Sequence, residues 1–198
     1  MINSPSNPTG VAYTRDELAA LGEVLKAHPQ ILIATDDMYE HIIWSEEPFS
    51  NILNPCPDLY ERTIVLNGFS KFYSMTGWRL GYALAPRDLL EPMLLYHQYM
   101  ITSTNTFAQW GAVTALKSDQ SSSFAMRDEF LKRRDFTHDA VNGLPGFSCT
   151  RPDGAFYLFP SVKEMVQRLD GVEDDLDLAE HFITHAGVAL VPGTAFGM

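Results

Sequence analysis

The chain has 198 residues, of which 45% are apolar, 20% charged and 12% aromatic, which is the composition of an ordinary globular protein. Its formal net charge of −11 would repel the phosphates of nucleic acids and anionic membrane surfaces, so we expect no nucleic-acid or membrane partner. No apolar run approaches the roughly 20 residues that span a bilayer, and no signal peptide is evident, so we expect a cytoplasmic protein.

The first residues of the chain predict a turn cluster followed by a helix. The run Asn-Ser-Pro-Ser-Asn-Pro-Thr-Gly at 3–10 is rich in turn formers. Thr14 and Glu17 then form a capping box, which is typical of a helix start, and Pro29 marks the end of the apolar helical stripe.

Three apolar runs predict a small, mostly parallel sheet. Those at 31–35 and 63–67 are short and continuous, as in strands that are buried on both faces. The run at 78–85 begins only about ten residues later, which is too few for a parallel crossover, so we expect it to be antiparallel. Lys71 and Arg79 would then lie at the same edge of the sheet.

The remainder of the chain predicts helices and a smaller second unit. The expected elements are helices at 89–99, 107–116, 123–142 and 176–185, and strands at 155–159 and 188–191. The change in pattern places a domain boundary near residue 120. We therefore expect an α/β fold in which residues 1–120 form part of a sheet sandwiched by helices. Residues 121–198 would form a linking helix and a small α/β domain.

Five short motifs occur in order along the chain. They are Asn7-Pro-Thr-Gly10, Asp36-x-x-Tyr39, Ser70-Lys71 through Thr76-Gly-Trp-Arg79-x-Gly81, Pro152-x-Gly-Ala-Phe-Tyr157 and Val191-Pro-Gly-x-x-Phe-Gly197. Taken singly, each is explained by a turn, a helix cap or a surface charge. Together, in this order and spacing, they resemble the class I aminotransferases, which are pyridoxal-phosphate enzymes of fold type I. The resemblance covers nearly the whole chain.

The resemblance implies three catalytic residues. The Lys71 amine would hold the cofactor aldehyde covalently and later carry a proton between the substrate and the cofactor. The Asp36 carboxylate would keep the cofactor's ring nitrogen protonated. Asp37 is less favoured for this role, because the family pattern places the ring partner three residues before Tyr39. Tyr39 would donate a hydrogen bond to the phenolic oxygen.

The resemblance also implies further contacts to the cofactor. Asn7 would share the phenolic oxygen with Tyr39, while Ser70 and Arg79 would bind the phosphate through a hydroxyl and a guanidinium. Many family members carry a second hydroxyl residue three positions before the lysine. Gly68 stands there in this chain, so one phosphate contact is expected to differ.

The function implied is transfer of an amino group between an amino acid, aspartate-like or aromatic, and a 2-oxo acid, by a homodimer. A carbon–sulfur β-lyase shares these motifs and remains an alternative. So does a non-catalytic, aminotransferase-like effector domain, although the basic winged-helix module that it would need is not in this sequence. His181 and His185 lie at helical spacing without a third ligand in sequence, so we expect no metal site.

The length of the chain differs from that of the family it resembles. Relatives have a long first half, which brings a phosphate cup and an aromatic ring stacked on the cofactor, and they continue to an arginine that binds the substrate carboxylate. This sequence starts near Asn7 and stops just after Gly197. We therefore expect part of a longer enzyme, and expect that residues 1–198 alone do not transaminate.

Overall fold

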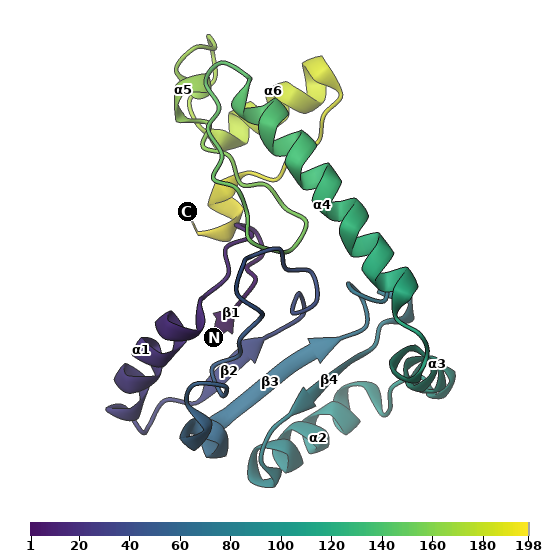
Figure 1. Ribbon diagram of the computed structural model, residues 1–198. Helices are drawn as coiled ribbons and strands as arrows, with labels where there is room; N and C mark the ends of the chain where they lie inside the picture. The colour runs from purple at the N-terminus through teal and green to yellow at the C-terminus, as the bar shows by residue number, and fades with distance from the viewer. Residues whose placement is uncertain (198) are drawn as a thin grey trace.

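A four-stranded sheet in the order β1-β2-β3-β4 lies at one end of the molecule (Figure 1). The computed structural model describes residues 1–197. The strands are β1 (Ile2–Asn3), β2 (Ile33–Asp36), β3 (Thr63–Gly68) and β4 (Gly81–Leu84). β1, β2 and β3 are mutually parallel and β4 is antiparallel to β3, so the predicted mostly parallel sheet is confirmed. β1 was not predicted, because two residues carry no periodic signal.

The register brings the ends of the strands together at one edge. Asn3 pairs with Asp36 at the carboxyl ends of β1 and β2, and Gly68 at the end of β3 pairs with Gly81 at the start of β4. A Cβ atom on Gly68 would lie 3.1 Å from the Cα of Gly81, so the close approach suits glycine. Lys71 follows β3 and precedes β4 at this edge, as expected from the antiparallel pairing.

The first helix, α1 (Arg15–Lys26), begins as predicted. Thr14 and Glu17 exchange the two hydrogen bonds of a capping box, which satisfies amide groups that the first turn leaves free. Leu18 on α1 is buried and packs in a core cluster with Ile33 of β2 and with Leu59. Leu59 lies in the 3-10 helix η1 (Pro57–Arg62), which leads into β3.

The strand that we expected at 78–85 starts later than predicted. Residues 76–78 form the 3-10 helix η2 (Thr76–Trp78), and Arg79 follows in the left-handed region with φ 53°. A left-handed residue cannot continue an extended strand, so β4 begins only at Gly81.

Three helices follow the sheet in the predicted order. They are α2 (Arg87–Ile101), α3 (Thr106–Lys117) and α4 (Ser121–Asn142). Ala108 and Ala112 of α3 are buried in a second core cluster with Phe69 and Leu80, which flank the paired ends of β3 and β4. α4 runs from the sheet end to the far end of the molecule (Figure 1).

The C-terminal region contains α5 (Lys163–Val166), α6 (Asp175–Ala186) and the 3-10 helix η3 (Gly193–Phe196). α6 ends at Gly187 with φ 66°, as predicted. The two predicted strands were wrong: within residues 1–197, neither 155–159 nor 188–191 pairs in a ladder. Ala155 has φ 58°, which interrupts an extended run, and an apolar segment needs a neighbouring strand to become one.

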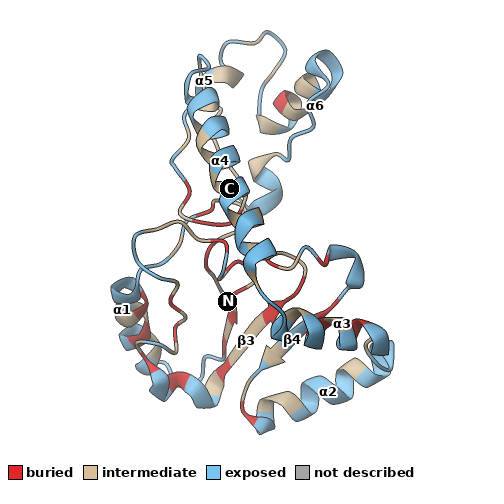
Figure 2. Cartoon of the chain, turned by 45° about the vertical axis from the view of Figure 1, so that its right-hand side comes forward, coloured by how far each residue is buried: buried red, intermediate tan, exposed pale blue. Residues whose placement is uncertain are grey.

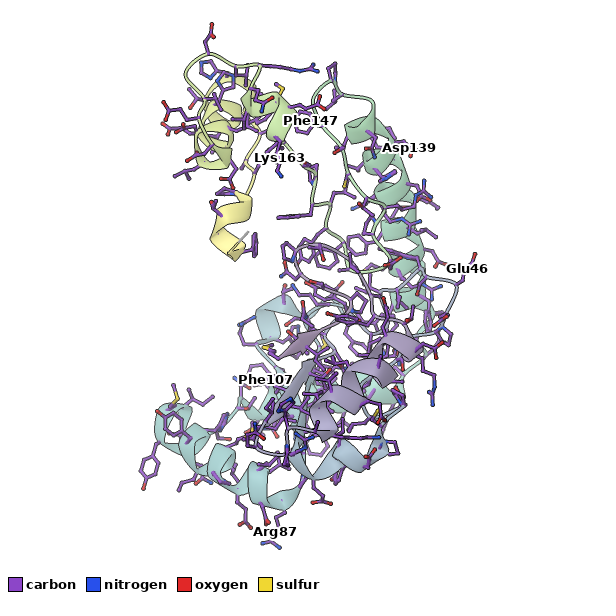
Figure 3. The ribbon with its side chains drawn as sticks, turned by 90° about the vertical axis from the view of Figure 1, so that its left-hand side faces the viewer. Glu46, Arg87, Phe107, Asp139, Phe147 and Lys163 are labelled. Carbon is purple, nitrogen blue, oxygen red and sulfur yellow. The ribbon has the colours of Figure 1, made fainter. Side chains whose placement is uncertain are left out.

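Burial is uneven across the molecule. Buried residues gather around the sheet and its adjoining loops, whereas α2 has none (Figure 2). The side chains of Arg87 and Phe107 lie at the sheet end, and those of Phe147 and Lys163 lie near α5 and α6 (Figure 3).

Among the described helices, none is both long and apolar enough to cross a membrane.

Candidate active site

The turn after β2 buries a tyrosine beside an aspartate. β2 ends at Asp36, whose Oδ1 accepts the backbone N–H of Met38 at 3.2 Å and so fixes the turn. Tyr39 follows and is only 3% exposed. Burial raises the pKa of Tyr39 well above its usual range, and the negative charge of Asp36 adds to this effect. The two family-motif residues of this turn therefore lie within electrostatic reach of each other.

The neighbouring aspartate, Asp37, is buried, and both of its carboxylate oxygens accept hydrogen bonds. The hydroxyl of Thr35 donates to its Oδ1 at 2.6 Å, and the side-chain amide of Asn51 donates to its other oxygen. Burial raises the pKa of Asp37, while these two hydrogen bonds oppose the rise. Asp36, in contrast, has one carboxylate oxygen without a protein partner among residues 1–197. Of the two carboxylates, only Asp36 has an oxygen that accepts no hydrogen bond within residues 1–197.

Lys71 reaches the Tyr39 turn from the end of β3. Its Nζ lies 5.6 Å from the centroid of the Tyr39 ring and 5.3 Å from that of Phe156. Both separations are within the range of cation–π attraction, which holds the amine against two aromatic faces. Within residues 1–197, Lys71 forms no ion pair with a carboxylate. The amine is thus positioned without being bound to an internal counter-ion.

A second tyrosine completes this cluster. Tyr157 Oη lies 2.5 Å from Tyr39 Oη, and the two rings meet edge to face with centroids 5.8 Å apart. Sequence reasoning gave Tyr157 no role, because 155–159 looked like an ordinary strand. The sequence pattern that could have identified Tyr157 is the Pro152-x-Gly-Ala-Phe-Tyr157 motif, whose last residue makes this contact. We call Asp36, Tyr39, Lys71 and Tyr157 the tyrosine cluster.

The loop that carries Tyr157 is anchored by backbone contacts. The N–H of Gly154 donates to the carbonyl of Gly10 at 2.9 Å, and the N–H of Ala155 donates to the carbonyl of Ile42 at 2.8 Å. A Cβ atom on Gly154 would lie 2.7 Å from the Ile42 carbonyl oxygen, so only glycine fits without a shift. This loop therefore ties the Asn-Pro-Thr-Gly turn to the tyrosine cluster.

The Asn7 side chain lies outside the tyrosine cluster. Asn7 is exposed, and its backbone N–H donates to the side chain of Asn3 at 2.7 Å. It lines a cavity of about 680 Å³ that Tyr157 and Phe196 also line. Asn7 and Tyr157 thus border a common space, without a hydrogen bond between them in the described residues.

The two residues expected at the phosphate differ in their exposure to solvent. Arg79 is exposed, and its guanidinium donates only to the carbonyl of Thr76, at 3.0 Å, within the described chain. Ser70 is half-buried beside Lys71. Within residues 1–197, no hydrogen bond or ion pair joins either side chain to the tyrosine cluster, although both lie at the same edge of the sheet.

The groups at this edge match those of pyridoxal phosphate in kind. Within residues 1–197, they comprise an amine without an ion pair, a carboxylate with one unbonded oxygen, a phenol, a hydroxyl and an exposed guanidinium. These correspond to the aldehyde, ring nitrogen, phenolic oxygen and phosphate of the cofactor. The carboxyl edge of parallel strands is also where α/β folds bind ligands.

The comparison with known families decides the family. The family model "Aminotransferase class I and II" matches residues 1–198. The chain belongs to this family. Its members work with pyridoxal phosphate, and solved members share the fold of this chain.

Named relatives include two bacterial enzymes. The chain is 45% identical to the aspartate/prephenate aminotransferase of Nitrosomonas europaea, over 100% of the chain and 51% of that protein. It is 40% identical to the aspartate aminotransferase of Geobacillus stearothermophilus, over 100% of the chain and 50% of that protein. The chain thus spans about half the length of the curated relatives that it matches.

Two solved structures are similar throughout the chain. The aspartate aminotransferase of Rhizobium meliloti superposes with a TM-score of 0.93 at 36% identity, covering 100% of this chain and 50% of that one. The aromatic aminotransferase of Pyrococcus horikoshii gives a TM-score of 0.90 at 36% identity, covering 100% and 51%. The mostly parallel α/β fold is therefore that of the aminotransferases of fold type I.

Proposed function

We propose that this chain supplies about half of a pyridoxal-phosphate-dependent aminotransferase that exchanges an amino group between an amino acid and a 2-oxo acid. The observation that carries the proposal is the Lys71 amine, which lies against Tyr39 beside Asp36. The names of the relatives support an aspartate-like or aromatic amino acid as substrate.

The tyrosine cluster would handle protons and covalent binding. When bound, pyridoxal phosphate supplies an aldehyde and an electron-withdrawing ring. The Lys71 Nζ would bind that aldehyde and later move a proton at the substrate carbon. The free oxygen of Asp36 would accept a hydrogen bond from the ring nitrogen and keep its proton in place. The Tyr39 hydroxyl would donate to the phenolic oxygen.

Arg79, Ser70 and Asn7 would hold the rest of the cofactor. Arg79 would bind the phosphate through its guanidinium, and Ser70 would add a hydroxyl. Asn7 would share the phenolic oxygen with Tyr39. Support for these roles comes from their places at the carboxyl edge of the sheet and beside the Tyr157 cavity.

We further propose how the chain is organised in the whole enzyme. Residues 1–120 would belong to the cofactor-binding domain, and residues 121–198 would form a linking helix and part of a small domain. The enzyme would work as a homodimer in the cytoplasm. Its free thiols, Cys56 and Cys149, are consistent with a reducing compartment.

A spectroscopic experiment tests the proposed function. Adding pyridoxal phosphate to the chain should produce a weak visible absorbance band in the wild type and none in Lys71→Ala. Lys132→Ala is the matched control, because Lys132 is exposed on α4 and pairs only with Glu129 within the described residues. Equal bands in Lys71→Ala and the wild type would contradict the assignment.

The reaction itself needs a separate assay. We expect residues 1–198 alone not to convert amino acids with 2-oxoglutarate, because the chain spans only about half of its relatives. The full-length enzyme should form glutamate from aspartate or an aromatic amino acid. Release of pyruvate and ammonia from a sulfur amino acid would instead favour the β-lyase.

A further inference from the structure

We propose that Tyr157 is a positioning residue whose hydroxyl oxygen accepts a hydrogen bond from the Tyr39 hydroxyl and thereby limits how strongly Tyr39 donates to the cofactor. This inference rests on the proposed function, in which Tyr39 donates to the phenolic oxygen. It concerns a residue outside the predicted site, on a loop more than 100 positions away in sequence.

Burial decides which hydroxyl is the donor. Tyr39 is 3% exposed, and in the described residues its Oη has no hydrogen-bond partner other than Tyr157. Tyr157 is half-buried and lines the 680 Å³ cavity, so its own proton has access to space beyond the contact. A buried hydroxyl donor without an acceptor is costly, so the Tyr39 proton belongs between the two oxygens.

The contact is built into the backbone rather than dependent on a mobile side chain. Ala155 sits in the left-handed region with φ 58° and donates its N–H to Ile42, three residues after Tyr39. Phe156 then packs edge to face on Tyr39 with ring centroids 5.4 Å apart. Tyr157 is therefore delivered to Tyr39 by a loop that is fixed on both sides.

Three groups face the Tyr39 phenol. They are the Asp36 carboxylate, the Lys71 amine and the Tyr157 hydroxyl. Burial is the largest cause of the raised pKa of Tyr39, and the hydrogen bond with Tyr157 raises it further. Removing the Tyr157 oxygen should leave the Tyr39 hydroxyl without its present acceptor. The same hydroxyl should then donate a stronger hydrogen bond to any other acceptor.

The first test needs no cofactor. Tyrosines labelled with ¹³C at Cζ can be titrated by NMR, and the signal of Tyr39 is identified as the one of eight that Tyr39→Phe removes. In Tyr157→Phe, which keeps the ring and its packing, we expect the pKa of Tyr39 to fall, because the neutral Tyr39 hydroxyl loses its hydrogen-bond acceptor. Tyr99→Phe, at an 84% exposed position on α2, is the matched control and should leave Tyr39 unchanged.

The second test uses bound pyridoxal phosphate. The Tyr39 hydroxyl competes with the proton held near Lys71 for the same cofactor oxygen. Tyr157→Phe should therefore move the pH midpoint of the visible absorbance downward, whereas Tyr39→Phe should move it upward. A merely structural role for Tyr157 predicts no such opposite shifts.

The outcomes separate the two proposals. An unchanged Tyr39 titration in Tyr157→Phe would overturn the role of Tyr157, whether or not the cofactor binds. Absence of any visible band in the wild type would overturn the proposed function and leave the NMR result to decide on Tyr157. A visible band whose midpoint is the same in Tyr157→Phe and the wild type would overturn the tuning role.

Discussion

The two turns at the carboxyl edge of the sheet differ in how far the chain itself fixes them. The turn after β2 buries Tyr39 and ties it to Tyr157 and to the anchored loop at Gly154. The turn before β4 leaves all of residues 76–79 exposed, and Arg79 bonds only to its own turn within the described residues. Tyr39, which is proposed to donate a hydrogen bond, is thus held in place by the folded chain, whereas Arg79, which is proposed to bind the phosphate, is not.

This difference has a physical reason. A proton donor works through its exact distance and environment, which packing can fix in advance. A guanidinium binds a phosphate through charge and paired hydrogen bonds, which can form when the ligand arrives. Substitutions at the exposed turn should therefore weaken ligand binding, whereas substitutions in the buried region should reduce stability.

The largest effect is expected for Arg79→Ala on binding. Losing one charge-assisted hydrogen bond costs about 1.5–3 kcal/mol, which corresponds to a roughly 10- to 150-fold weaker affinity for pyridoxal phosphate. The free energy of unfolding should stay within about 0.5 kcal/mol of the wild type, since the residue is exposed. Absorbance titration and urea unfolding measure the two quantities.

The matched control for Arg79 is Arg87→Ala. Arg87 is exposed on α2 and pairs with Glu91, so it carries the same charge away from the sheet edge. If both variants lost affinity equally, general electrostatic attraction would replace the specific role of Arg79.

The next effect concerns stability. In Gly154→Ala the new Cβ would lie 2.6 Å from Pro5 and 2.7 Å from the Ile42 carbonyl, so the backbone must shift. We expect a loss of about 1–3 kcal/mol in the free energy of unfolding, measured with urea and without cofactor. Gly77→Ala, where a Cβ meets nothing within 4 Å, should change it by less than about 0.5 kcal/mol. Equal losses would show that the Gly154 loop and the turn before β4 tolerate an added Cβ equally well, which would contradict the difference in packing.

The smallest effect is a pH dependence at Asp37. Burial raises its pKa in the folded state, so the folded chain favours the protonated form more than the unfolded chain does. The stability that this gives is present at low pH and is lost as the pH rises through the raised folded value. Asp37→Asn cannot ionise, so its stability relative to the wild type should increase as the pH rises from about 3 to about 7. A constant difference would contradict the buried-charge account.

Local signals in the sequence predicted much of the fold. Three predictions that depend on short-range patterns are confirmed. They are the capping box at Thr14, the antiparallel pairing of β4 and the end of α6 at Gly187. The strand predicted at 155–159 was wrong, because an apolar run cannot reveal the left-handed Ala155 or the absence of a partner strand.

The candidate site was predictable only in part. The family pattern favoured Asp36 over Asp37, but the physical reason, the contacts of Asp37 with Thr35 and Asn51, depends on folded neighbours. The Tyr39–Tyr157 contact likewise joins residues 118 positions apart, and the motif that contains Tyr157 does not reveal its partner. The roles of the predicted site residues remain predictions.

The central claim is that Lys71 is the residue that binds the cofactor covalently. Borohydride reduction of the chain with pyridoxal phosphate, followed by proteolysis and mass spectrometry, locates the attached group directly. We predict a single major label on Lys71, which is lost in Lys71→Ala and kept in Lys132→Ala. A main label on Lys26, Lys117, Lys132 or Lys163 would contradict the account.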